Sequence, residues 1–219
     1  MRALAGTRKP KTQPCVEVIG LGIVALVGCE VHGCGPGSLC MGQKCVDQLL
    51  ADLLTLKEHY GDLSKVHLAF VGDGNNVCHS LMLGAAIMGM TLTVVTPQGF
   101  GPDAHVLLRA QAIAEKSGAK LTLSQHVSAA AGADAIYTDT WLSMGAKADP
   151  KLVENLFAPY QINTAVMQRL AVKHFMHCLP AHRGHEVTSE VLDSDNSLVL
   201  QQAENRMHAQ NAVLVSLFS

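Results

Sequence analysis

The sequence predicts one α/β domain, a doubly wound parallel sheet, preceded by an atypical leader. From residue 48 onward, short apolar runs of strand length alternate with longer segments of helical period. Such alternation is typical of a parallel sheet with helices on both faces. The 219 residues are enough for one good core or two small ones, and no apolar run reaches the length of a membrane span.

Composition excludes several classes of partner. The net charge of -2 gives no reason to expect nucleic acid or an anionic membrane as a ligand. Aromatic residues are only 4% of the chain, which argues against a platform for stacking bases. The late cysteines, Cys78 and Cys178, lie in a region typical of a cytoplasmic enzyme, where free thiols are the rule.

Residues 1–45 differ in kind from the rest, because they are rich in Gly, Pro and Cys and show no helical period. We expect them to be poorly ordered. A lipoprotein signal box at 26–29 is a weaker alternative, since Glu17 interrupts the apolar run before it. A zinc site is another weak alternative, since no CxxC pair occurs among Cys29, Cys34, Cys40 and Cys45. We therefore predict no metal site.

The first regular elements follow from apolar spacing and from the residues that end them. Leucines at helical spacing predict a helix that Gly61 ends, and a short apolar run predicts the strand after it. A glycine-containing turn leads into the next helix, and Pro97 closes the second strand. The expected elements are a helix over 48–60, a strand over 66–71, a turn over 72–76, a helix over 77–88 and a strand over 91–95.

The second half continues the alternation. Asp103 lies in the first turn of a helix that Gly118 ends, and short apolar runs again predict strands. The last helix is expected to begin at Gln202, which puts Arg206 near its start, where the helix dipole does not favour a cation. The expected elements are helices over 102–117, 127–131, 150–158, 162–170 and 202–218, and strands over 120–123, 133–138 and 172–178.

Three polar motifs follow predicted strands, at the sheet edge where α/β proteins bind ligands. Each has a plainer reading: the asparagines of the first form a turn, Asp139 caps a helix, and Cys178 is a buried thiol. The first motif lacks the GxGxxG pattern, which makes a nucleotide the weaker interpretation. The motifs are GDGNN at 72–76, TDTWLSMG at 138–145 and HCLPAHRG at 177–184.

Together with QAENR at 202–206, these motifs resemble those of ornithine carbamoyltransferases, and the resemblance covers residues 48–219. Aspartate carbamoyltransferases have HPLP in place of HCLP and lack the SMG loop, so the combination favours ornithine. The resemblance implies a Rossmann-like fold, a cytoplasmic location, homotrimers, and transfer of a carbamoyl group from carbamoyl phosphate to the δ-amine of ornithine. The products are citrulline and phosphate, in arginine metabolism, without metal or cofactor.

The resemblance also assigns roles to individual residues. Asp139 holds the amino-acid substrate, Cys178 lies at the reacting centre, and Arg206 reaches the carbamoyl group; these three are the candidate catalytic residues. Orientation of the two substrates and stabilisation of the tetrahedral oxyanion then supply the catalysis. The candidate substrate-binding residues are Gln48, Asn76, Asp139, Ser143, Met144, Cys178, Leu179 and Arg206.

Before residue 48 the resemblance ends. The family's phosphate-binding STRT tetrapeptide does not occur, and of its HPCQ motif only Gln48 remains, with Cys45 in place of the histidine. We therefore divide the chain into a leader (1–45), a remnant helix of the carbamoyl-phosphate domain (46–64) and an ornithine-binding domain (65–219). Three alternatives stay open: a non-catalytic ornithine-binding remnant, a carbamoyltransferase for another amine, and a nucleotide-binding protein.

Overall fold

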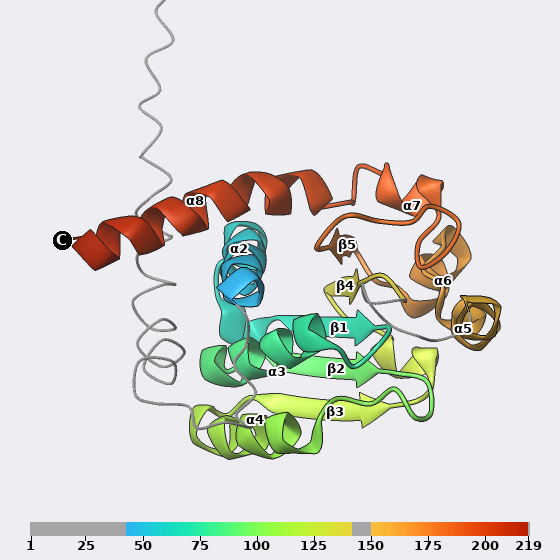
Figure 1. Ribbon diagram of the computed structural model, residues 1–219, viewed down its shortest axis with the longest axis horizontal. Coiled ribbons are helices and arrows are strands. Elements are labelled where there is room, and N and C mark those ends of the chain that lie inside the picture. Colours follow the sequence, from blue (N-terminus) through green and yellow to red (C-terminus); the bar gives the residue numbers. More distant parts are fainter. Residues whose placement is uncertain (1–42, 142–149, 219) are drawn as a thin grey trace, which may run out of the picture.

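The computed structural model describes residues 43–141 and 150–218. Within them, strands and helices alternate as the sequence predicts (Figure 1). The helices are α2 Gln43–Tyr60, α3 Asn76–Met88, α4 Ala104–Ser117, α5 Pro150–Phe157, α6 Thr164–Leu170, α7 Ser189–Leu192 and α8 Val199–Phe218, with short 3₁₀ turns η1 Leu63–Lys65, η2 Val127–Ala130 and η3 Ala158–Tyr160. The strands are β1 His67–Val71, β2 Thr91–Val95, β3 Lys120–Ser124, β4 Ala135–Thr138 and β5 His174–His177.

The five strands form one parallel sheet in the order β3-β2-β1-β4-β5, which confirms the predicted fold class. The side chains of successive residues in each strand point to opposite faces of the sheet. Leu68 and Phe70 of β1 pack with α2, α3 and α4, whereas Ala69 and Val71 pack with α6 and α7. The sheet is thus covered on both faces, as its buried strands require.

Helices α2 and α8 form a further layer, in which α8 runs across α2 (Figure 1). Leu50 and Leu54 of α2 pack with Ala209 and Ala212 of α8. On its other side α2 approaches α3 closely, and a Cβ at Gly84 would meet Leu49 at 2.6 Å. A larger residue at 84 would therefore force the Leu49 side chain to shift, and glycine allows the close approach of these helices.

Several predicted boundaries were wrong. Helix α8 begins at Val199, so Arg206 lies in its second turn, and the dipole argument based on a start at Gln202 does not hold. The segment predicted as a helix over 127–131 is the 3₁₀ turn η2, and the single-turn elements η1 and α7 were not predicted. Single turns escape sequence analysis because they are too short to show a period. The expected disorder of residues 1–45 falls almost wholly outside the described residues.

Candidate active site

The candidate site lies at the point of the parallel sheet where the order of the strands reverses. The sheet proceeds from β1 to β2 and β3 on one side and to β4 and β5 on the other, so the β1/β4 boundary is a topological switch point. The hydroxyl of Thr138 donates to the carbonyl of Val71 over 2.7 Å and ties the two strand ends together. Gly72 and Asp139 are the next residues after these two strand ends. Gly72 has a positive φ of 152°.

Asp139 is nearly buried, and its carboxylate is held by three donors. The thiol of Cys178 donates to Oδ1, with 3.0 Å between sulfur and oxygen, and the backbone N–H of Thr140 donates to the same oxygen over 2.7 Å. The amide nitrogen of Asn75 donates to Oδ2 over 2.8 Å. The sequence motifs after β1, β4 and β5 therefore meet at one carboxylate.

The thiol of Cys178 stays protonated at neutral pH. Burial raises its pKa well above the usual range of a thiol, and the charge of Asp139 and the hydrogen bond to it raise the pKa further. Since the thiolate is the nucleophilic form, this environment disfavours a covalent role for Cys178. A protonated thiol beside a carboxylate is instead suited to orienting that carboxylate.

The strand end at His177 is fixed by a buried pair of side chains. His177 Nε2 lies 3.4 Å from Oε1 of Glu186, and both side chains are almost completely buried. Its Nδ1 accepts from the backbone N–H of Leu179 over 2.9 Å. Burial would raise the pKa of Glu186, but the close contact with His177 and the hydrogen bond from the His182 backbone N–H lower it. The backbone of Leu179 is held at a positive φ of 55°.

The two asparagines of the first motif have different surroundings. Asn76 is the predicted substrate-binding residue, and its side chain is exposed. The hydrogen bond to Asp139 comes from Asn75. Asn75 also caps α3 by accepting from the N–H groups of Val77 and Cys78. No sequence signal separated the two, because both are asparagines in one turn. Ser143 and Met144 lie outside the described residues.

Gln48 and Arg206 lie in the α2–α8 layer. Gln48 is buried and donates to Asp52 over 2.8 Å. Arg206 is half-buried, and its positive charge lowers the pKa of Asp52. Gln202 of α8 joins this layer to the strand end, since its Nε2 donates to Asp52 over 2.8 Å and its Oε1 accepts from the N–H of His177 over 3.0 Å. Sequence analysis missed Asp52 and Gln202.

Three groups that commonly bind metals lie together here. One ligand atom from each of Asp139, His177 and Cys178 falls within 4.8 Å of the others. Hydrogen bonds account for the arrangement, since the thiol donates to the carboxylate and His177 Nδ1 accepts from Leu179. A protonated thiol is also not the ligand form of cysteine.

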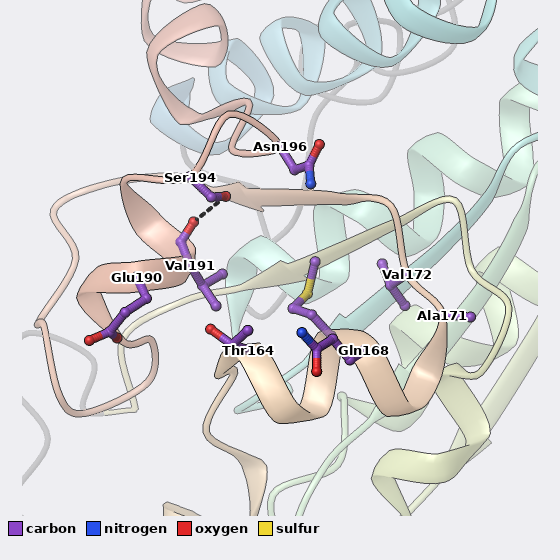
Figure 2. A pocket seen from close by; sticks show the side chains of 9 residues that line it. Thr164, Gln168, Ala171, Val172, Glu190, Val191, Ser194 and Asn196 are labelled. Atoms are coloured by element: carbon purple, nitrogen blue, oxygen red, sulfur yellow. Dashed lines mark hydrogen bonds between the residues drawn. The ribbon is translucent and has the colours of Figure 1, made fainter.

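A separate hollow of about 270 Å³ lies between α6 and the segment around α7, and none of the candidate site residues lines it (Figure 2). It is lined by Thr164, Met167, Gln168, Ala171, Val172, Glu190, Val191, Ser194 and Asn196. Among residues 43–141 and 150–218, no helix has the length and apolar character needed to cross a bilayer.

Comparison with known proteins identifies the family. Residues 64–217 match the model of the Asp/Orn-binding domain of aspartate/ornithine carbamoyltransferases. The chain belongs to this family. An ornithine carbamoyltransferase of Shewanella oneidensis is 56% identical over 172 residues, or 78% of this chain and 57% of the relative. One from a Vibrio species is 51% identical over 195 residues, or 88% of this chain and 64% of the relative.

Solved structures agree with this assignment. The ornithine carbamoyltransferase of Gloeobacter violaceus superimposes with a TM-score of 0.72 at 46% identity, over 79% of this chain and 58% of that protein. The chain thus spans less than two thirds of the relatives it matches. The matched part contains the β1, β4 and β5 motifs that meet at Asp139.

Proposed function

We propose that this chain binds ornithine and carries the ornithine side of a carbamoyl transfer that yields citrulline and phosphate. The observation that carries the proposal is the carboxylate of Asp139, held by Cys178 and Asn75 at the switch point of the sheet. A fixed, nearly buried carboxylate attracts the ammonium group of an amino-acid substrate. The relatives from Shewanella, Vibrio and Gloeobacter described above are ornithine carbamoyltransferases, which supports ornithine as that substrate.

In the proposed reaction the δ-amine nitrogen of ornithine forms a bond to the carbamoyl carbon. The bond between that carbon and the phosphate oxygen breaks, and the amine proton leaves with the phosphate. The amine attacks the carbamoyl carbon directly, so no bond to sulfur is required. The protonated thiol of Cys178 is also a poor nucleophile. In this proposal Asp139, Asn76, Ser143 and Met144 hold ornithine, Cys178 and Leu179 lie at the reacting centre, and Gln48 and Arg206 serve the carbamoyl end.

The proposal includes a cytoplasmic location and a homotrimer, both of which rest on the resemblance to the family. It also includes the division at residues 45 and 64. A carbamoyltransferase for another amine is the second candidate, and the SMG sequence at 143–145 argues against it.

Citrulline formation by the purified chain tests the proposal, with Cys178→Ala as the blank. We expect turnover at least about a hundredfold below that of a complete ornithine carbamoyltransferase, because these 219 residues contain no STRT loop to donate hydrogen bonds to phosphate. Replacing ornithine by Nα-acetylornithine or putrescine should abolish the signal. Preference for either of these amines would contradict ornithine as the substrate, and turnover equal to that of the complete enzyme would contradict the assignment of the carbamoyl end.

A further inference from the structure

A buried carboxylate outside the three motifs, Asp52 of α2, connects the two halves of the site. Its side chain is 1% exposed. One oxygen, Oδ1, accepts from Gln48 one turn earlier in the same helix and from Gln202 of α8, each over 2.8 Å. Two amide groups from different helices thus converge on one oxygen atom.

The connection continues to the sheet. The other end of the Gln202 amide accepts from the backbone N–H of His177 over 3.0 Å, directly before Cys178. Asp52 is therefore two hydrogen bonds from the strand end that carries the thiol, and one from Gln48. The bond between Asp52 and Gln202 joins residues 150 apart in the sequence, and the bond between Gln202 and His177 joins residues 25 apart.

Charged and titratable groups face Asp52 from each neighbouring element: Arg206 from α8, Tyr137 from β4, and Cys178 after β5. Neither Oδ2 of Asp52 nor the buried hydroxyl of Tyr137 makes a hydrogen bond of normal geometry in this conformation. Burial raises the pKa of Asp52 to about 6, although Gln202, Gln48, Tyr137 and Arg206 all act to lower it. The ionised carboxylate is therefore unfavourable for folding.

A purely structural role explains this site poorly. The apolar part of the α2–α8 contact is made by leucines and alanines, and an apolar side chain at 52 would extend it without burying a charge. The same two helices are already joined by a neutral hydrogen bond one turn further on, from Asn205 to the hydroxyl of Thr55 over 3.0 Å. A carboxylate that opposes folding is typical of a functional position.

We propose that Asp52 is a positioning residue for carbamoyl transfer, which orients the Gln48 amide and the His177–Cys178 strand end together. This inference rests on the proposed function. By engaging the nitrogen of Gln48, Asp52 leaves the oxygen of that amide to accept from the substrate. By engaging the nitrogen of Gln202, it turns the oxygen of Gln202 toward His177.

The first arm of the test needs no turnover. In the ¹⁵N-labelled chain titrated from pH 5 to 8, the side-chain amides of Gln48 and Gln202 and the backbone amide of His177 should shift together, with one midpoint near pH 6. Asp52→Asn should abolish this shared transition. The matched control is Thr55→Val, which removes the neighbouring bond between α2 and α8 and should leave the transition intact. Independent midpoints in the wild type would overturn the inference.

The second arm measures citrulline formation at saturating ornithine and excess carbamoyl phosphate. Asp52→Asn should lower the rate at least about tenfold and leave the ornithine Kd within about twofold, as expected when the charge-assisted hydrogen bonds that orient Gln48 and Gln202 are weakened. Thr55→Val should leave both unchanged. If Asp52→Asn does not fold, Gln202→Met removes the link to His177 and should lower the rate similarly.

The outcomes separate the two proposals. Failure of the wild type to bind ornithine would overturn the proposed function, while the pH titration would still decide whether Asp52 links the two amides. A wild type that binds ornithine but whose Gln48, Gln202 and His177 amides do not titrate together would overturn the positioning role. Equal rates for Asp52→Asn and the wild type, or equal losses in Asp52→Asn and Thr55→Val, would show that Asp52 only joins the helices.

Discussion

The strand-end region around Asp139 and the α2–α8 layer around Asp52 present contrasting uses of a buried carboxylate. At Asp139, three short motifs meet because parallel strands deliver their carboxyl ends to one edge of the sheet. At Asp52, the donors come from the first and the last of the described helices, α2 and α8. The comparison shows that the sheet topology places one half of the site, while helix packing aligns the other half with it.

Truncation of a core side chain in each region should give the largest effects. Phe157 is fully buried and contacts Phe100 and Trp141, with ring centroids 5.0 and 5.8 Å away. Phe157→Ala should lower the free energy of unfolding by about 3–5 kcal/mol, and Leu54→Ala in the α2–α8 layer by about 2–5 kcal/mol. Chemical denaturation measures both losses.

Ornithine affinity then distinguishes the two variants. Trp141 follows Asp139 by two residues, so loosening its aromatic cluster should weaken ornithine binding. Leu54 belongs to a cluster that does not touch the strand ends, and its truncation should leave the affinity of the folded fraction unchanged. An equal loss of affinity in both variants would show that the two regions are not separate.

Asp52→Asn should instead stabilise the protein, and by an amount that depends on pH. Because the folded-state pKa of Asp52 is raised to about 6, its contribution to stability is fully present below its unfolded pKa and is lost as pH rises through about 6. The free energy of unfolding of the variant should therefore exceed that of the wild type by roughly 1–3 kcal/mol at pH 7.5 and by much less at pH 4. Denaturation at both pH values measures the difference, and a gain independent of pH would contradict a charged Asp52.

A smaller effect is expected at the first motif. Asn75→Ala removes both the cap of α3 and a donor to Asp139. It should lower the free energy of unfolding by about 1–2 kcal/mol. Asn76→Ala changes an exposed side chain and should cost less, while weakening ornithine binding if the family role applies. Thermal denaturation compares the two, and the reverse order of stability would refute the assignment of the cap.

The difference between the two regions also explains what sequence analysis found. The succession of strands and helices along the chain was predictable, and so was the meeting of Asp139 and Cys178, since both residues directly follow apolar runs and parallel strands end at one edge. The spacing of Gln48 and Asp52 at i and i+4 was visible but is common on helices. The part played by Gln202 was not visible, because it depends on where α8 crosses α2 and on a helix that starts at Val199.

Calorimetric titration of ornithine into the purified chain at pH 7.5 tests the central claim, that Asp139 is the carboxylate that binds this substrate. We expect Asp139→Asn to weaken binding by roughly 1–3 kcal/mol, or about 5- to 150-fold in Kd, since a charge-assisted hydrogen bond is lost. The matched control is Asp134→Asn, which changes a carboxylate just before the same strand β4, bonded to the N–H of His67, and should leave the affinity unchanged. Unchanged affinity in Asp139→Asn, or the same loss in both variants, would contradict the account.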